Sequence, residues 1–321
     1  MAVYTQLDNT DFEQLLADYD LGKLQNYKGI EGGIENTNYF VTLKNQNTQS
    51  EYVLTLFEEL SYEELPYFIE LCQWLHERNV AVPYAIKDCN GIGLKKLKNR
   101  PAALQPRFYG EHVGQTELTP EHCAAIGKVL GEFHVAAEDF YMQRQAHRGV
   151  FWWRRESELI AAKLPAADAQ MLHEEVARFD QLREHPGNIK MGTIHGDLFH
   201  DNVLFQGTEV SAVLDLYNAA SAFLLFDLAI VANDWCCNPD GAIDSKREQA
   251  LLKAYAEARP FTSDEYKAWP VLTCTAAMRF WLSRLIPWLD ENSEQKLKDP
   301  DELKQILLYR RKNPSQLPAT E

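Results

Sequence analysis

A short polar segment between two apolar stretches constrains this chain more than any other part of its sequence. Residues 193–205 read Thr-Ile-His-Gly-Asp-Leu-Phe-His-Asp-Asn-Val-Leu-Phe, so β-prone residues stand on both sides of a polar loop. A second β-prone run, 210–214, follows and ends directly before Asp215. The pattern predicts short strands around a functional loop, with one more carboxylate where the next strand ends. The loop places His195, Asp197, Asp201 and Asn202 within eight positions.

The order of these groups matches the requirements of phosphoryl transfer from Mg-ATP. In that chemistry one carboxylate takes the proton of the attacking hydroxyl, while an amide and a second carboxylate hold the metal ion that bridges the phosphates. Asp197, Asn202 and Asp215 follow one another in the corresponding order. His-Gly-Asp also occurs in ordinary turns, because Gly permits unusual backbone angles and Asp caps its own turn. The combination with Asn202 and Asp215 favours an enzyme that phosphorylates a small hydroxylated molecule.

Composition narrows the class of partner. The net charge of −15 disfavours non-specific binding to nucleic acid or to anionic lipid, so we expect a small-molecule substrate, no nucleic acid and no membrane. The longest apolar stretch, 219–232, is too short to span a bilayer and contains Asp227. The six cysteines lack zinc-type spacing and no secretory signal is evident, so we expect a cytoplasmic protein with reduced thiols. The sequence leaves the oligomeric state open.

The pattern of predicted elements changes near residue 110. Before it, strand and turn signals alternate around helices at 8–21 and 61–78. The predicted strands lie at 23–30, 37–43 and 51–57, followed by a hairpin over 85–96 and an extended segment at 104–109. The later part is mainly helical, with helices predicted near 119–138, 154–164, 168–184, 222–236, 244–257, 264–290 and 299–312. We therefore predict an α+β protein with an antiparallel-sheet lobe followed by a helical lobe.

A glycine-rich turn is the candidate for phosphate binding. The chain has neither Gly-x-x-x-x-Gly-Lys-Ser/Thr nor Gly-x-Gly-x-x-Gly, and residues 29–38 instead join the first two predicted strands. Glycine lets backbone N–H groups approach a phosphate, and Asn or Thr side chains can donate hydrogen bonds to it. Such turns are also common without a ligand, so the turn is a weak signal by itself. The candidate phosphate contacts are Gly32, Gly33, Asn36, Thr37 and Asn38.

The motif His195-Gly-Asp197-Leu-Phe-x-Asp201-Asn202, with Asp215, resembles the aminoglycoside-phosphotransferase/choline-kinase superfamily, a branch of the protein-kinase-like fold. Within it the chain is similar, over about residues 1–312, to the bacterial homoserine kinases. Six further segments carry that similarity: 32–39, 52–58, 100–104, 226–229, 233–235 and 279–284. The resemblance implies ATP and Mg²⁺ as cofactors and transfer of the γ-phosphoryl group to the hydroxyl of L-homoserine, a step of threonine biosynthesis.

The resemblance also implies roles for parts of the chain. It implies a two-lobed protein-kinase-like fold, with a nucleotide-binding lobe over 1–108 and a catalytic and substrate lobe over 109–321. Asp197 is then the catalytic base, and Asn202 and Asp215 are the metal ligands. The segment 105–108 resembles the hinge that meets adenine, through Pro106 and Phe108, while His195 and Asp227 support the catalytic loop by hydrogen bonds.

The chain departs from the superfamily pattern in three places. Thr55 stands where relatives usually carry a Lys that touches the phosphates, so the phosphate charge must be met elsewhere. Asp215 is followed by Leu-Tyr rather than Phe-Tyr, and His200 stands where Arg is commoner. The candidates for the glutamate that pairs with this Lys in relatives are Glu63, Glu64 and Glu70, and the sequence does not decide among them.

An amino-acid acceptor needs a cation for its carboxylate and an acidic or carbonyl group for its ammonium. Arg279 and Arg284 are candidates for the carboxylate, although their spacing does not put them strictly on one helix face. Asp201 is the candidate for the ammonium, and Tyr217 completes the predicted substrate set. The alternatives are a kinase for choline, another amino alcohol or an aminoglycoside, and a non-catalytic nucleotide-binding pseudokinase, which only Thr55 supports.

Overall fold

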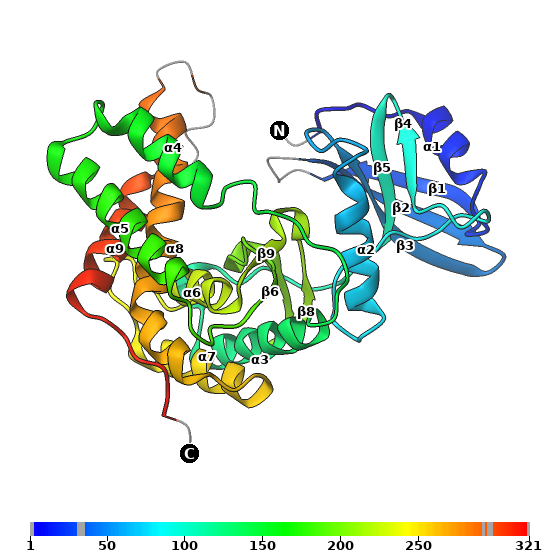
Figure 1. The fold of residues 1–321 in the computed structure, drawn as a ribbon. Coiled ribbons are helices and arrows are strands. Elements are labelled where there is room, and N and C mark those ends of the chain that lie inside the picture. The colour runs from blue at the N-terminus through cyan, green and yellow to red at the C-terminus, as the bar shows by residue number, and fades with distance from the viewer. Residues whose placement is uncertain (1–2, 31–35, 291–292, 294–297, 320–321) are drawn as a thin grey trace. The chain divides into compact units, whose positions relative to one another are not determined.

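The computed structural model describes residues 3–30, 36–290, 293 and 298–319. The chain divides into two compact units, Met1–Tyr109 and Gly110–Glu321 (Figure 1). The first contains an antiparallel sheet with two helices, and the second is mainly helical with four short strands. The predicted α+β class, with the sheet first and the helices after it, is confirmed.

The N-terminal unit is built on a five-stranded sheet of order β1-β2-β3-β5-β4, antiparallel throughout. Side chains of β2 alternate between buried and half-buried positions over most of its length, as expected for a strand with one face in a core. That core joins β2 and β3 to Phe12 of α1, whose ring stacks on Tyr27 with centroids 4.2 Å apart. The elements are α1 (Asn9–Leu16), β1 (Lys23–Gly29), β2 (Asn36–Asn45), β3 (Thr48–Phe57), α2 (Leu65–His76), β4 (Leu94–Leu97) and β5 (Arg100–Pro106).

The prediction of a hairpin over 85–96 is wrong. Its Asn90–Gly91 turn exists, but Asp88 closes it: the Asp88 Oδ1 atom accepts the backbone N–H groups of Asn90 and Ile92, both at 2.9 Å. This side-chain-capped loop has no strand before it. The hairpin forms instead between β4 and β5, where Lys98 and Asn99 both have positive φ, the geometry of a tight two-residue connection.

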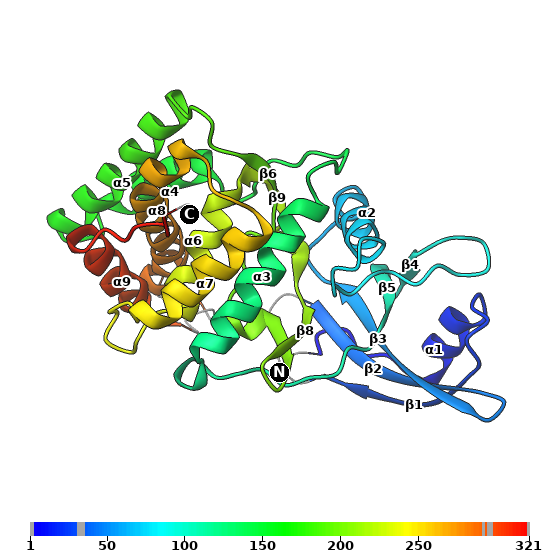
Figure 2. The same ribbon diagram turned by 90° about the horizontal axis from the view of Figure 1, so that it is seen from below.

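The C-terminal unit surrounds the buried helix α6 (Leu224–Trp235), all of whose residues are buried. Helix α8 packs on α6, and α9 packs on α8. Helices α3 and α7 lie side by side in Figure 2 and form an extensive contact. The other helices are α3 (Pro120–Ala136), α4 (Val150–Ala161), α5 (Ala166–Glu184), α7 (Ser245–Ala258), α8 (Ser263–Leu289) and α9 (Pro300–Lys312).

Two small two-stranded sheets in this unit bring distant loops together. Strand β6 (Met191–Ile194) pairs with β9 (Ala220–Phe223), and β7 (Val203–Gln206) pairs with β8 (Glu209–Val213). The loop 195–202 leaves β6 and enters β7, and the loop 214–219 leaves β8 and enters β9. Because both loops connect the same two sheets, they lie next to each other.

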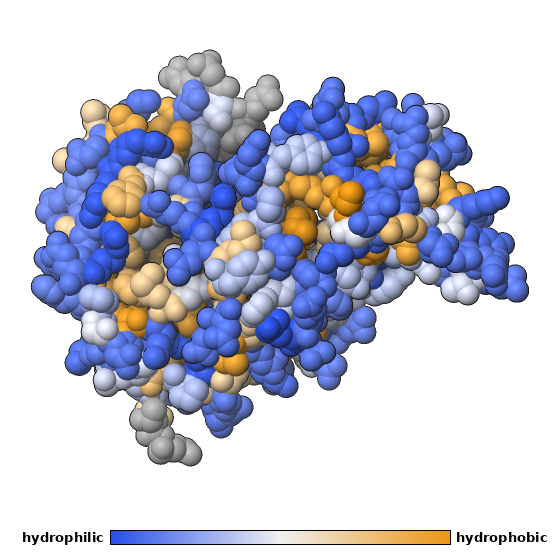
Figure 3. All heavy atoms as spheres, turned by 45° about the vertical axis from the view of Figure 1, so that its right-hand side comes forward, coloured by the Kyte–Doolittle hydropathy of each residue, from blue (hydrophilic) through white to orange (hydrophobic). Residues whose placement is uncertain are grey.

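The visible surface in Figure 3 is largely hydrophilic, with smaller groups of hydrophobic side chains between. Among the described residues, no helix combines the length and the apolar character needed to cross a membrane. Most of the apolar run 219–232 lies in β9 and in the buried helix α6.

The contact between α3 and α7 gives a test of the packing. A Cβ atom added at Gly127 of α3 would lie 2.3 Å from the Leu251 carbonyl oxygen of α7. Alanine favours an isolated helix over glycine by about 1 kcal/mol. We nevertheless expect Gly127→Ala to lower the free energy of unfolding by about 1–3 kcal/mol, because backbone must move to admit the methyl group. Thermal unfolding followed by circular dichroism measures this, with the neighbouring exposed Lys128→Ala as the control; an unchanged or raised Tm for Gly127→Ala would contradict the packing.

Candidate active site

A buried carboxylate fixes the backbone of the loop that follows β6. The Asp227 Oδ2 atom accepts the N–H of His195 at 2.7 Å, and its Oδ1 atom accepts the N–H of Gly196 at 2.9 Å. Asp227 is fully buried in α6. Two backbone bonds to one rigid carboxylate leave little freedom to the peptide that precedes Asp197. Asp227 thus ties the start of the loop 195–202 to α6.

Two buried histidines complete this network. The His134 Nε2 atom lies 3.2 Å from Asp227 Oδ2, and its Nδ1 atom lies 2.8 Å from the Tyr255 hydroxyl. Burial lowers the pKa of His134 and of His195, so both rings are neutral at neutral pH. Burial alone would raise the pKa of Asp227, but its hydrogen bonds with His134 and Gly196 outweigh this and hold that pKa below its usual value. Asp227 thus stays an acceptor, and a neutral His134 donates to it from Nε2 and accepts from Tyr255 at Nδ1.

His195 links the loop to the end of β8. Its Nε2 atom donates to the Leu214 carbonyl at 2.9 Å, and its Nδ1 atom accepts the N–H of Asp197 at 3.3 Å. The Leu214 N–H in turn donates to the Asn202 carbonyl at 2.8 Å. These bonds hold the residue before Asp215 against both ends of the loop 195–202. The predicted base and the two predicted metal ligands are therefore brought to one place.

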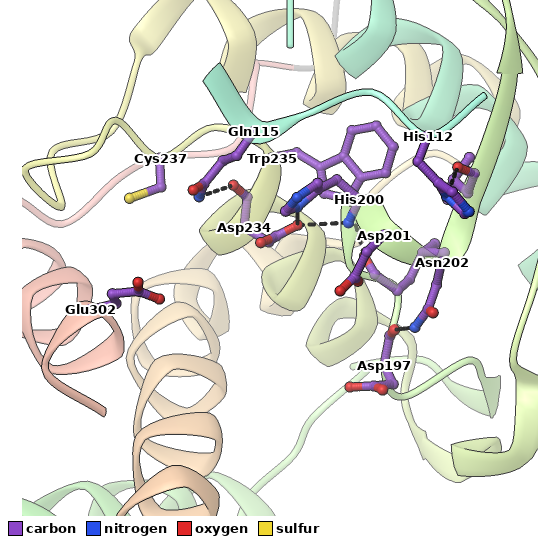
Figure 4. Close-up of polar contacts among 12 residues, drawn as sticks. His112, Gln115, Asp197, His200, Asp201, Asn202, Asp234, Trp235, Cys237 and Glu302 are labelled. Atoms are coloured by element: carbon purple, nitrogen blue, oxygen red, sulfur yellow. Dashed lines mark hydrogen bonds and ion pairs between the residues drawn. The ribbon is translucent and has the colours of Figure 1, made fainter. Parts of the chain in front are cut away.

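The orientation of the Asn202 amide suits a role as a metal ligand. Its Nδ2 atom donates to the Asp197 carbonyl at 2.8 Å, as Figure 4 shows. This bond uses the donor end of the amide and directs the oxygen Oδ1 away from that carbonyl, where it can bind a cation. Amide and carboxylate oxygens are the hard ligands that Mg²⁺ prefers.

The donor set at Asn202 and Asp215 fits a magnesium ion held together with a nucleotide. Among the described residues, no group of three or more His, Cys, Asp or Glu side chains lies together as a ready metal site. Mg²⁺ commonly takes only one or two protein ligands and completes its shell with waters and substrate phosphates. A pair of protein oxygens is thus sufficient for such an ion.

The backbone around these predicted ligands is strained. Asp215 has φ 59° and ψ 56°, a left-handed conformation that costs energy for any residue with a side chain. Gly196 has φ 80°, and a Cβ atom there would lie 2.7 Å from the Asn218 carbonyl oxygen. The loops 195–202 and 214–219 therefore approach each other so closely that only glycine fits at position 196.

The predicted phosphate-binding residues are only partly described. Gly32 and Gly33 lie outside the described residues, and Asn36, Thr37 and Asn38 begin β2. The buried Thr37 hydroxyl accepts the Tyr4 N–H at 2.9 Å and donates to Glu58 Oε1 at 2.7 Å. Thr37 thus has a structural use, and phosphate contacts of this segment stay a prediction.

The place of the missing Lys is buried and neutral. The Thr55 hydroxyl donates to Asn38 Oδ1 at 2.7 Å and also lies 3.2 Å from Gln105 Oε1. The proposed hinge residues Pro106 and Phe108 are half-buried at the end of β5 and just beyond it. Their contact with adenine stays a prediction.

One cavity of the C-terminal unit, with a volume of about 610 Å³, carries charges of both signs. It lies among α6, α8, α9 and the 3-10 helix η2 (His200–Asn202). Asp201 lines it and forms an ion pair with Lys298 at 3.0 Å. Burial raises the pKa of Asp201, but Lys298 outweighs this and holds it below the usual value. Arg284 also lines this cavity, where it bonds Glu302 at 2.7 Å and the Asp299 carbonyl at 3.0 Å.

Asp234 is the residue of this cavity that sequence reasoning missed. Its Oδ2 atom accepts both the backbone N–H of His200, at 2.7 Å, and the ring Nδ1–H of His200, at 2.8 Å (Figure 4). Burial lowers the pKa of His200, but the bond to Asp234 outweighs it and raises that pKa above its ordinary value. The segment 233–235 entered the sequence comparison only as a similar motif, and nothing local marked Asp234 as facing a cavity.

A second cavity, of about 350 Å³, is lined by Gly196, Tyr217 and Arg279 among others. The predicted substrate residues are thus divided between two cavities: Asp201 and Arg284 line the first, and Tyr217 and Arg279 line the second. The two arginines do not face one common ligand site.

Comparison with known proteins identifies the family of this chain. Residues 26–261 match the model of the phosphotransferase enzyme family, APH. A homoserine kinase of Pseudomonas aeruginosa is 42% identical over 89% of this chain and 89% of its own, and one of Methylobacillus flagellatus is 42% identical over 89% and 87%. A solved amicoumacin kinase in complex with AMP-PNP has the same fold, with a TM-score of 0.68 and 14% identity over 95% of this chain and 93% of its own. The resemblance expected from the sequence is confirmed, and the chain belongs to the phosphotransferase enzyme family.

Proposed function

We propose that this protein transfers the γ-phosphoryl group of ATP to the hydroxyl of L-homoserine. The observation that carries the reaction type is the convergence of Asp197, Asn202 and Asp215 through the bonds of His195, Leu214 and Asn202. Homoserine kinases at 42% identity, over most of both chains, support the acceptor.

In this reaction Asp197 accepts the proton of the acceptor hydroxyl. Its backbone is held by His195 and by Asn202, so its carboxylate needs little rearrangement to reach the attacking oxygen. Asn202 and Asp215 hold Mg²⁺, which supplies charge neutralisation on the phosphate oxygens. Catalysis by positioning and charge requires no further reactive side chain.

The cavity beside η2 suits a zwitterionic acceptor, because it presents both signs of charge within one space. Both hydrogen bonds from His200 go to Oδ2 of Asp234. Oδ1 can therefore accept a hydrogen bond from the ammonium group of the substrate. Arg284 and Lys298 supply positive charge for the carboxylate. His200 acts as a positioning residue, because it orients Asp234 and does not itself need to touch the acceptor.

One observation favours a second class of acceptor. Besides Asp201 and Asp234, the same cavity is lined by Asp240, Asp301 and Glu302. This acidic excess suits a cationic amino alcohol or aminoglycoside better than an amino acid.

Acceptor choice is therefore the first test. We expect coupled ADP release with Mg-ATP to show a kcat/KM for homoserine at least about tenfold above that for serine, threonine, choline, ethanolamine or kanamycin, because one binding group lost or misplaced costs about this much. Equal or better turnover of choline would make an amino alcohol the acceptor, and the phosphotransferase reaction would stand. No ADP release with any acceptor would support the pseudokinase instead.

Substitution of the base tests the mechanism. We expect Asp197→Asn to lower kcat by about 10²–10⁴-fold, the usual contribution of a general base, with little change in ATP affinity measured by calorimetry. Glu209→Gln, which removes an exposed carboxylate at the start of β8, is the matched control and should retain most of kcat. A kcat for Asp197→Asn close to that of the unsubstituted enzyme would refute the assignment.

Substitution of Asp234 tests the acceptor cavity. We expect Asp234→Asn to raise the KM for homoserine at least about tenfold, because a charge-assisted bond to the ammonium is lost, while the KM for ATP stays within about twofold. Glu257→Gln, which removes an exposed carboxylate on α7, controls for net charge. An unchanged homoserine KM for Asp234→Asn would place the acceptor elsewhere.

A further inference from the structure

The second cavity of the C-terminal unit has a charge pattern that phosphoryl transfer to a zwitterion does not explain. Four arginines line it: Arg144, Arg148, Arg183 and Arg279. Among the described residues, no Asp or Glu lines it. The chain has a net charge of −15, so these arginines form a local cluster of positive charge in an acidic protein. Such a cluster favours an anionic ligand.

The wall of this cavity is aromatic. Trp153 packs on Phe179 with ring centroids 5.0 Å apart and on Phe226 at 5.7 Å. Phe151 and Met191 also line the cavity, although 59% and 64% of their surfaces are exposed. Large apolar side chains left exposed at a cavity are typical of a ligand site. The ligand should therefore carry an apolar body as well as a negative charge.

The segment that carries two of the arginines is held in place. Arg144 pairs with β9, since the Ser221 N–H donates to its carbonyl at 2.8 Å and its own N–H donates to the Ser221 hydroxyl at 3.3 Å. The Trp153 indole N–H donates to the Arg148 carbonyl at 2.6 Å. The aromatic wall and the arginine-bearing backbone are thus one connected structure. This preorganisation lowers the entropic cost of binding.

We propose that this cavity binds a small amphipathic carboxylate, distinct from the phosphoryl acceptor. The arginines hold the carboxylate, and the apolar body packs on the aromatic wall. A free amino acid is a poor occupant, because no Asp or Glu among the described residues lines the cavity to pair with its ammonium. The ligand would also lie against Gly196, the residue before Asp197, and against Tyr217 in the loop after Asp215.

Titration of the full chain with 3-phenylpropionate tests the proposal, with 3-phenylpropan-1-ol as a ligand of the same skeleton without charge. We expect saturable calorimetric binding of the carboxylate, at least about tenfold tighter than that of the alcohol, because the charge-assisted bonds are lost in the alcohol. Arg148→Gln should weaken 3-phenylpropionate about fivefold or more for the same reason. The matched control is Arg155→Gln, whose exposed side chain on α4 lies outside the cavity lining.

Three results would overturn the proposal: no saturable binding of 3-phenylpropionate, equal affinity for the alcohol, or an unchanged affinity in Arg148→Gln. Homoserine kinetics of the same variant separate the two cavities. Arg148→Gln should leave the homoserine KM unchanged, and a rise in that KM equal to the loss of 3-phenylpropionate affinity would make the cavity part of the acceptor site. The titration needs neither ATP nor homoserine, so failure of the proposed kinase activity would leave its outcome intact.

Discussion

The arrangement of the candidate active site depends on the carboxylate of Asp227. A buried ionised group is stable only when its oxygens are hydrogen-bonded, and Asp227 meets this condition with the N–H groups of His195 and Gly196 and with His134. The same hydrogen bonds that stabilise the buried charge also fix the backbone directly before Asp197. An apolar residue at this position would leave the two buried N–H groups of His195 and Gly196 without acceptors, and the loop would lose its anchor to α6.

The loop 214–219 is held in turn by hydrogen bonds that the ring of His195 and the carbonyl of Asn202 form with the backbone of Leu214. Asp215 adopts a left-handed conformation there, and Gly196 meets the Asn218 carbonyl at a distance that no other residue allows. A strained backbone persists only where surrounding contacts hold it in place. In this protein the two-stranded sheets β6-β9 and β7-β8 supply those contacts. Residues of these loops also line two cavities of different charge: His200 and Asp201 line the one that carries both signs, and Gly196 and Tyr217 line the one that carries four arginines.

Much of the architecture followed from local pattern. The periodicity of apolar residues predicted the helices from 119 onward, and the antiparallel strands before them followed from alternation and turns. The error at 85–96 arose because Asn90–Gly91 is a turn signal with two uses, and the side chain of Asp88 decided between them. Strand β9 was absorbed into a predicted helix, because a short apolar run has no period of its own and only pairing with β6 makes it a strand.

The sequence by itself determined the chemistry of the loop, because the order of Asp197, Asn202 and Asp215 is a local property of one hairpin and its flanks. It could not determine which charged residues share a cavity. Asp234 meets His200, and Arg279 and Arg284 separate into different cavities, only because α6 and α8 pack against the loop at particular rotations. Such contacts join residues tens of positions apart, and they depend on the packing of whole helices rather than on any spacing along the chain.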